Sequence, residues 1–149
     1  MSSVIVVSSL YNLMQAIQIR NTILKDESVD LVLCSSQDKI EQIYNNGYLE
    51  HVFCNVYLLK KTHYYMSYNR IEKIISFISP AYELKRMLNT RIIPRWNKVY
   101  MWNPVGFTYF YYRYNKIRHL SCHYYLYADS AGGYEKSKVD INSPYHSKV

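Results

Sequence analysis

The sequence lacks several features that would place it in a familiar class. Its 149 residues include only three cysteines, Cys34, Cys54 and Cys122, and this odd, widely spaced set excludes a disulfide framework and offers no zinc-ligand spacing. No apolar run approaches the roughly 18 residues that a membrane span needs. The first apolar run, residues 4–7, is too short for the core of a signal peptide. These absences predict a cytoplasmic protein.

Glycine and the common catalytic motifs are also scarce. The chain has four glycines, and neither a GxGxxG segment after the first apolar run nor a GxxxxGK[ST] segment occurs, so the usual dinucleotide and P-loop phosphate sites are unsupported. HExxH and GxSxG motifs are absent, and the five histidines are scattered. We therefore expect neither a metal site nor a bound cofactor.

Positive charge is concentrated in the middle of the chain. Residues 60–118 hold twelve of the 18 Lys and Arg residues but only two acidic residues, Glu72 and Glu83. A basic surface of this kind suits an anionic membrane, a nucleic acid or an anionic sugar, although a solvated surface has the same composition. Because no nucleic-acid recognition motif accompanies the charge, we expect no nucleic-acid partner.

Aromatic residues alternate with cations in the same region. Residues 109–114 read YFYYRY, and such aromatic side chains beside Arg113 could stack on bases or sugars. On a helix, however, about half of them must pack against the rest of the domain. Trp96 and Trp102, beside Arg91 and Arg95, are a second candidate surface because tryptophan is frequent at membrane interfaces.

Short apolar runs alternate with helical patterns along the chain. Residues 3–8, 29–34, 51–59, 98–102 and 123–128 are typical of buried strands. The segments between them favour helices at 10–24, after Ser35 or Ser36 as a cap, at 71–88 with a break at Pro80, and at 105–118.

This alternation predicts an α/β fold, a doubly wound, mostly parallel five-stranded sheet with the first strand in the centre. We assign residues 1–135 to one Rossmann-like domain and residues 136–149, which are polar and without periodicity, to a flexible tail.

In such sheets ligands bind at the carboxyl ends of the strands, where this chain has small or polar residues. The segment after the last predicted strand, Tyr127-Ala-Asp-Ser-Ala-Gly-Gly-Tyr134, gives the sharpest signal. Its Asp129 is suited to accept a proton from a hydroxyl nucleophile, or else it caps a turn in which the glycines adopt positive φ angles.

Two segments resemble bacterial sialyltransferases of glycosyltransferase family 52 and their polysaccharide relatives. Residues 7–17, VSSLYNLMQAI, resemble the family's opening, in which the first strand runs into a segment like TPFQLLNA. The Asp129 segment looks like the family motif EDGxGSY, with Asp129 on the second acid, Gly132 on the later glycine and Tyr134 on the tyrosine. Ala128 and Ser130 stand where the motif has its first acid and its first glycine.

This resemblance implies one Rossmann-like half of a GT-B fold, the acceptor-side domain of a glycosyltransferase of surface polysaccharide or lipooligosaccharide synthesis. It implies that Asp129 acts as the general base and that the acceptor contacts are Ser8, Ser9, Asn12, Asn103, Ser130 and Gly132. The donor would be a nucleotide sugar such as CMP-sialic acid. The donor domain of the family carries a His-Pro motif that this chain lacks, so we expect the chain to be inactive alone.

The partners implied by the resemblance are a glycan or glycolipid acceptor and a second glycosyltransferase domain or chain. The alternative is a non-catalytic interaction module whose basic aromatic segment binds an anionic glycan, a membrane surface or a partner protein. Both interpretations are compatible with a peripheral position at the inner face of a membrane.

Overall fold

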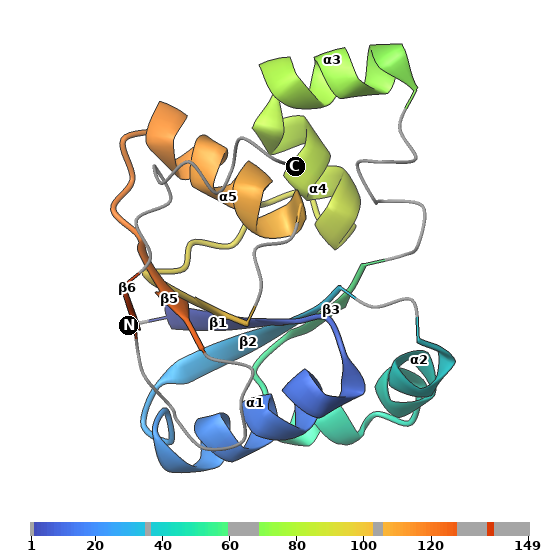
Figure 1. Cartoon of the computed structure of the whole chain (residues 1–149), viewed down its shortest axis with the longest axis vertical. Coiled ribbons are helices and arrows are strands. Elements are labelled where there is room, and N and C mark those ends of the chain that lie inside the picture. The colour runs from blue at the N-terminus through green and yellow to red at the C-terminus, as the bar shows by residue number, and fades with distance from the viewer. Residues whose placement is uncertain (1, 35–36, 60–68, 103–105, 128–136, 139–149) are drawn as a thin grey trace.

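A parallel β-sheet separates two layers of helices (Figure 1). The computed structural model describes residues 2–34, 37–59, 69–102, 106–127 and 137–138. Within these ranges the strands are β1 (Ser2–Val7), β2 (Ser28–Leu33), β3 (Val56–Leu58), β4 (Lys98–Met101), β5 (His123–Leu126) and β6 (Ser137–Lys138).

The strands lie in the order β3-β2-β1-β4-β5-β6. The first five are parallel, and the two-residue β6 is antiparallel to β5. The predicted doubly wound, mostly parallel sheet with the first strand in its centre is therefore confirmed, and the arrangement is Rossmann-like. The strand β6 falls within 136–149, the segment for which the sequence predicts a tail.

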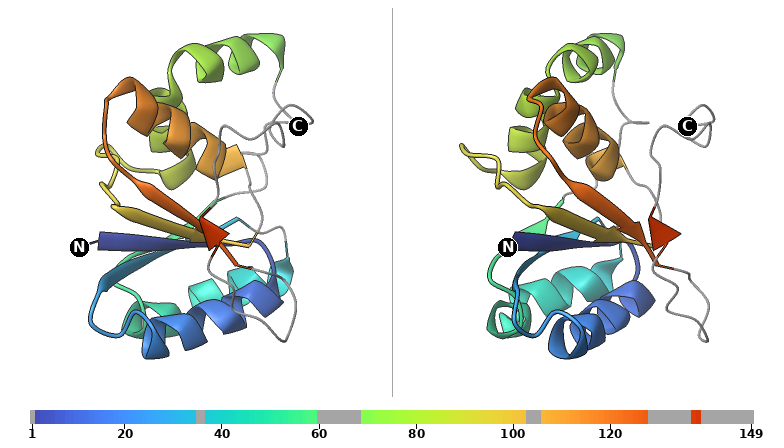
Figure 2. Two further views of the ribbon diagram at one scale, coloured as in Figure 1. Left: turned by 60° about the vertical axis from the view of Figure 1, so that its left-hand side comes forward. Right: turned by 90° about the vertical axis from the view of Figure 1, so that its left-hand side faces the viewer.

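The helices divide between the two faces of the sheet (Figure 2). On one face lie α1 (Leu10–Thr22), α2 (Asp38–Asn45) and the 3₁₀ helix η1 (Tyr48–His51). On the other face lie α3 (Arg70–Ile78), α4 (Pro80–Leu88) and α5 (Gly106–Ile117), and α3 is the helix farthest from the sheet (Figures 1 and 2). None of the helices in the described ranges is both long enough and apolar enough to cross a membrane.

Alternating side chains of the strands build a separate core on each face. In β1, Val4 and Val6 point to the α3–α5 side, whereas Ile5 and Val7 point to the α1–α2 side. All four side chains are buried, as the unbroken apolar run predicts, and burial of each stabilises the fold by about 2 kcal/mol. The side chains of β2 and β4 alternate in the same way, so the sheet needs a helix layer on both faces.

The third strand is shorter than the sequence predicts. Residues 51–59 have a strand-like composition, but only Val56–Leu58 pair with β2. Gly47 adopts a positive φ of 76° after α2 and starts the 3₁₀ turn, and the apolar Leu49 and Phe53 then fill the core instead of a strand face. The break predicted at Pro80 is confirmed, since Pro80 is the first residue of α4.

A buried polar network ties the amino edge of the sheet to the helix layer. The Asp30 carboxylate accepts hydrogen bonds from Trp96 Nε1 at 2.7 Å and from Asn55 Nδ2 at 2.9 Å. The hydroxyl of Tyr111 in α5 accepts a bond from the Trp96 backbone N–H at 2.8 Å. Trp96 is therefore a core anchor, and Trp102 is buried as well, so these two side chains do not form the exposed candidate surface.

Candidate functional site at the carboxyl edge of the sheet

Four parallel strands end at one edge of the sheet. In the register, Val7 of β1 pairs with Leu33 of β2, and Met101 of β4 pairs with Leu126 of β5 and with Val6 of β1. The chain after β1 enters the α1 layer, whereas the chain after β4 enters the opposite α5 layer. The carboxyl ends of β1 and β4 therefore form the topological switch point at which ligands bind in open α/β sheets.

The turn from β1 into α1 brings together three of the predicted acceptor-binding residues. Ser9 is the N-cap of α1, and its hydroxyl accepts a bond from the Asn12 backbone N–H at 3.1 Å and donates one to Asn12 Oδ1 at 2.6 Å. Asn12 is buried, and Ser8 and Ser9 are half-buried. Two of the three side chains therefore have a capping role, and Ser8 is the polar side chain of this turn that the cap does not use.

A glutamine from the next β–α connection reinforces this turn. Gln37 immediately precedes α2, and its Oε1 accepts a hydrogen bond from the Leu10 backbone N–H at 3.2 Å. Ser35 and Ser36, predicted as caps of this helix, lie outside the described residues, and the N-cap position belongs to Gln37. This contact could not be predicted from local sequence because its partners are 27 positions apart.

The residue after β4 supplies a buried hydrogen-bond donor, although the sequence suggests an exposed side chain at this position. Trp102 is 3% exposed, and its ring lies 5.4 Å from that of Tyr127, the residue after β5. Its Nε1 finds no hydrogen-bond acceptor among the residues that the structure describes. A buried donor without an acceptor costs about 1–3 kcal/mol, so within the described residues this N–H is an unsatisfied polar group at the carboxyl edge.

An unpaired acceptor lies on the same side of the sheet. Gln15 of α1 is buried, and within the described part of the chain its Oε1 has no donor. Trp102 packs in the core on the α1 side, so both polar atoms belong to the layer between α1 and the sheet. Burial and the neighbouring Tyr125 raise the pKa of Tyr127 to about 12, so its hydroxyl remains protonated at neutral pH.

The remaining predicted residues, Asn103, Asp129, Ser130 and Gly132, lie outside the described residues. Their roles as general base and acceptor contacts stay predictions. The residues before them, Trp102 and Tyr127, both lie at the carboxyl edge. Across the described ranges, no cluster of His, Cys, Asp and Glu side chains could hold a metal ion.

Comparison with known proteins does not identify a family for this chain. No protein-family model, no curated protein and no solved structure matches the chain. The resemblance to glycosyltransferase family 52 therefore depends on the two short segments alone.

Proposed function

We propose that the chain is the amino-terminal, acceptor-side domain of a sialyltransferase-like glycosyltransferase of surface polysaccharide or lipooligosaccharide synthesis. The main observation in support is that residues 7–17, the segment resembling the family's opening, span the end of β1, the β1–α1 turn and the first part of α1 at the switch point of a Rossmann-like sheet. A family-like sequence and a ligand-binding position of the fold coincide there.

The chemistry of this edge suits a carbohydrate. Sugar hydroxyls both donate and accept hydrogen bonds, and the half-buried Ser8 hydroxyl at this edge can do both. In the proposed reaction the Asp129 carboxylate takes the proton of the acceptor hydroxyl while the oxygen of that hydroxyl attacks the anomeric carbon of the donor sugar. The bond from that carbon to the nucleotide phosphate breaks, and CMP leaves when CMP-sialic acid is the donor.

The first experiment uses the chain as it is and asks whether it binds acceptor glycans. The two tryptophans lie at opposite ends of β4, because Trp96 precedes the strand and Trp102 follows it. Incorporation of fluorotryptophan therefore gives one resonance at each edge of the sheet, and Trp102→Phe assigns them. A panel of galactose-terminated and sialylated oligosaccharides should shift the Trp102 resonance and leave that of Trp96 unchanged.

Variants of two serines at opposite edges locate the binding. Ser8→Leu fills the carboxyl edge with a larger side chain and should weaken glycan binding at least about tenfold. Ser28→Leu, at the exposed amino end of β2, is the matched control and should bind as the parent does. Glycan binding that perturbs Trp96, or that Ser8→Leu leaves intact, would overturn the proposed site.

A second experiment addresses the proposed base. Asp129→Asn keeps the size of the side chain and should change acceptor binding by less than about twofold. When the chain is supplied with a donor domain that restores transfer from CMP-sialic acid, the same substitution should lower turnover about 10²-fold, the usual effect of losing a general base. Near-full turnover by the Asn variant would favour the turn-capping role of Asp129.

A further inference from the structure

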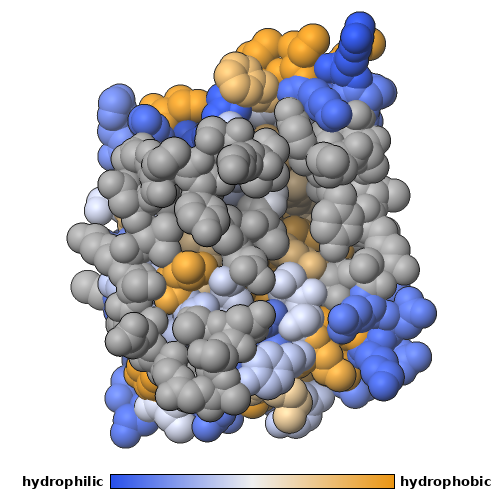
Figure 3. Space-filling model, viewed as in Figure 1, coloured by the Kyte–Doolittle hydropathy of each residue, from blue (hydrophilic) through white to orange (hydrophobic). Residues whose placement is uncertain are grey.

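The outermost helix, α3, exposes apolar residues to solvent. Ile71, Ile74, Ile75 and Ile78, here called the isoleucine stripe, are spaced as one face of a helix, and Ile71, Ile74 and Ile78 are 68%, 58% and 73% exposed. The neighbouring Phe77 is exposed too. Figure 3 shows hydrophobic atoms at the top of the molecule, where Figure 1 places α3. A contiguous apolar surface of this kind marks an interaction site.

Polar contacts hold α3 in this orientation. Its one fully buried residue is Ser76, whose hydroxyl donates to the Lys73 carbonyl oxygen, and Glu72 on the same face pairs with Arg86 of α4 at 3.8 Å. Arg113 of α5 donates to the Phe77 carbonyl oxygen at 2.6 Å, and its guanidinium carbon lies 4.1 Å from the centre of the Phe77 ring. The polar face of α3 is thus turned toward the protein and the isoleucine stripe toward solvent.

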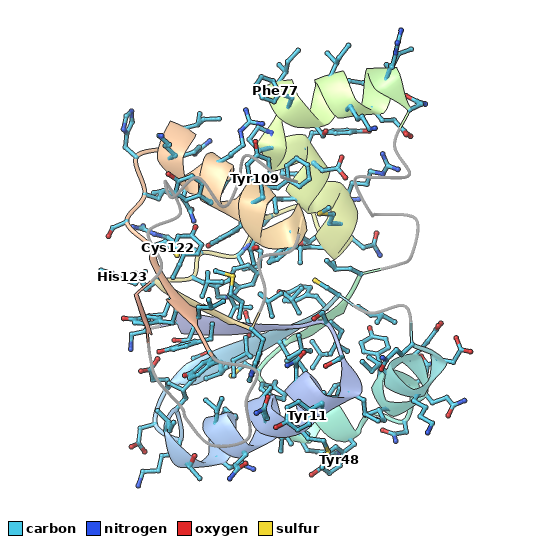
Figure 4. All side chains as sticks on the ribbon, viewed as in Figure 1. Tyr11, Tyr48, Phe77, Tyr109, Cys122 and His123 are labelled. Atoms are coloured by element: carbon cyan, nitrogen blue, oxygen red, sulfur yellow. The ribbon has the colours of Figure 1, made fainter. Side chains whose placement is uncertain are left out.

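Residues around the stripe are basic and aromatic. Arg70 and Lys73 lie on α3 itself, and the layer formed by α3, α4 and α5 also contains Lys85, Arg86, Arg113 and Lys116. Glu72 offsets only Arg86, with which it is paired, and Glu83 is buried, so six cations face two acidic residues in the helices of this layer. Tyr82 of α4 and Tyr109 of α5 are exposed aromatic residues in the same layer, and Figure 4 shows Tyr109 near Phe77.

Charge decides which occupant fits this surface. Two copies of the chain meeting through α3 would bring Arg70 and Lys73 against the same cations, which costs binding energy. A helix of nine residues is only about 13 Å long, too short to bury the roughly 800 Å² per partner of a stable interface. An anionic bilayer needs no shape complementarity, and it attracts each cation while it solvates the isoleucines.

We propose that α3 docks the protein on an anionic lipid surface. The isoleucine stripe enters the boundary between headgroups and acyl chains, while the exposed Arg70 contacts lipid phosphates and the half-buried Lys73 adds to the positive charge near them. The helix lies in the plane of the bilayer, and this contact is independent of the proposed sugar site, which is at the carboxyl edge of the sheet.

The test measures sedimentation of the whole chain with vesicles. We expect binding to phosphatidylglycerol–phosphatidylcholine vesicles and at least about tenfold weaker binding to phosphatidylcholine alone. I71Q/I74Q/I78Q should reduce binding more than about tenfold, and glutamine preserves helix propensity. M14Q/I23Q, which alters two exposed apolar residues of the opposite layer, is its matched control and should bind as the parent does.

Two double variants compare the contributions of cations in the two layers to vesicle binding. R70Q/K73Q should weaken binding to the anionic vesicles about tenfold, whereas K25Q/K39Q, at exposed sites near or on the α1–α2 layer, should not. Thermal unfolding of each variant verifies the fold, and it should change little because the substituted residues are exposed or half-buried on the surface.

Depth of insertion gives a second, independent measurement. The indole introduced by Ile74→Trp should be quenched by lipids with brominated acyl chains, while that introduced by Met14→Trp should not. Equal binding to neutral and anionic vesicles, equal loss in both apolar variants, or absence of quenching would overturn the proposal. So would a dimer in solution that I71Q/I74Q/I78Q converts to a monomer, because α3 would then be an interface between copies.

Discussion

The two helical layers differ in how they use their apolar residues. In the α1–α2 layer, Leu13, Ala16 and Ile19 of α1 are buried on the sheet, and the helical segments carry two basic and three acidic residues (Arg20, Lys39, Asp38, Glu41 and Glu50). In the opposite layer, α4 and α5 cover the sheet, and α3 packs on α4 with its isoleucines exposed. The helices of the α1–α2 layer therefore carry no excess of positive charge, while the opposite layer presents a basic, apolar surface.

The comparison also separates the two candidate surfaces. The carboxyl edge combines a capped turn with a buried indole donor, which is suited to a small polar ligand. The α3 surface is apolar and lies on the outermost helix, and it is suited to an extended partner. A glycosyltransferase acting on glycolipids would use both, but each can fail experimentally without the other.

The largest expected difference in stability is between an Ile→Ala substitution in one layer and the same substitution in the other. Ile19→Ala in α1 removes a buried side chain and should lower the free energy of unfolding by about 3 kcal/mol. Ile74→Ala in α3 should change it by less than about 0.5 kcal/mol because the side chain is exposed. Urea denaturation of the two variants measures the difference. Equal losses would show that the isoleucine stripe belongs to the core in solution.

The two tryptophans provide the next comparison. Trp96→Phe leaves the Asp30 carboxylate without its 2.7 Å donor, whereas Trp102→Phe removes an N–H for which the described residues offer no acceptor. We expect Trp96→Phe to be more destabilising by about 2 kcal/mol, the usual value of a hydrogen bond to a charged group. Equal effects of the two substitutions in urea denaturation would contradict the unpaired state of the Trp102 indole.

Alkaline pH should weaken both layers. Burial raises the pKa of Tyr111, in α5, and of Tyr127, on the α1 side, to about 12. Since the unfolded chain deprotonates first, stability contributed by these hydroxyls is present below pH 10 and is lost as pH rises toward 12, at roughly 1.4 kcal/mol per pH unit for each group. Unfolding measured from pH 9 to 11 should be less pH-dependent in Tyr127→Phe than in the parent.

The smallest effect concerns a single ion pair at the amino edge. Burial alone would raise the pKa of Glu27, but hydrogen bonds from Lys98 and Ser3 and the Lys98 charge lower it overall. The pair therefore stabilises the fold above the ordinary value of 4.5, and its contribution is lost as pH falls through the lower folded-state value. Lys98→Met should cost about 1 kcal/mol at neutral pH and flatten the acid limb of the stability profile. If Lys98→Met left the acid limb of the stability profile unchanged, the proposed contribution of the Glu27–Lys98 pair would be contradicted.

Much of the fold was predictable because it depends on local patterns. Residues 109–114 are an example, because the sequence predicts that about half of these aromatic side chains pack in the core. Phe110 and Tyr111 are buried there while Tyr109 remains exposed, as expected for aromatic residues all round a helix. The candidate site was predictable only in part. Ser8, Ser9 and Asn12 meet in one turn, but Gln37 and Trp102 join the edge through long-range packing.

The sequence by itself determined the alternation of buried strands with helices and the central position of β1 in the sheet. An unbroken apolar β1 must be covered on both faces, and the spacing of Ile71, Ile74 and Ile78 puts them on one side of a helix. Only the tertiary structure decided which way that side faces and how deep the tryptophans lie. Arg86 and Arg113 hold the polar face of α3 inward. The Trp96 indole can be buried because the fold brings its acceptor, Asp30, beside it, although the two residues are 66 positions apart in the sequence.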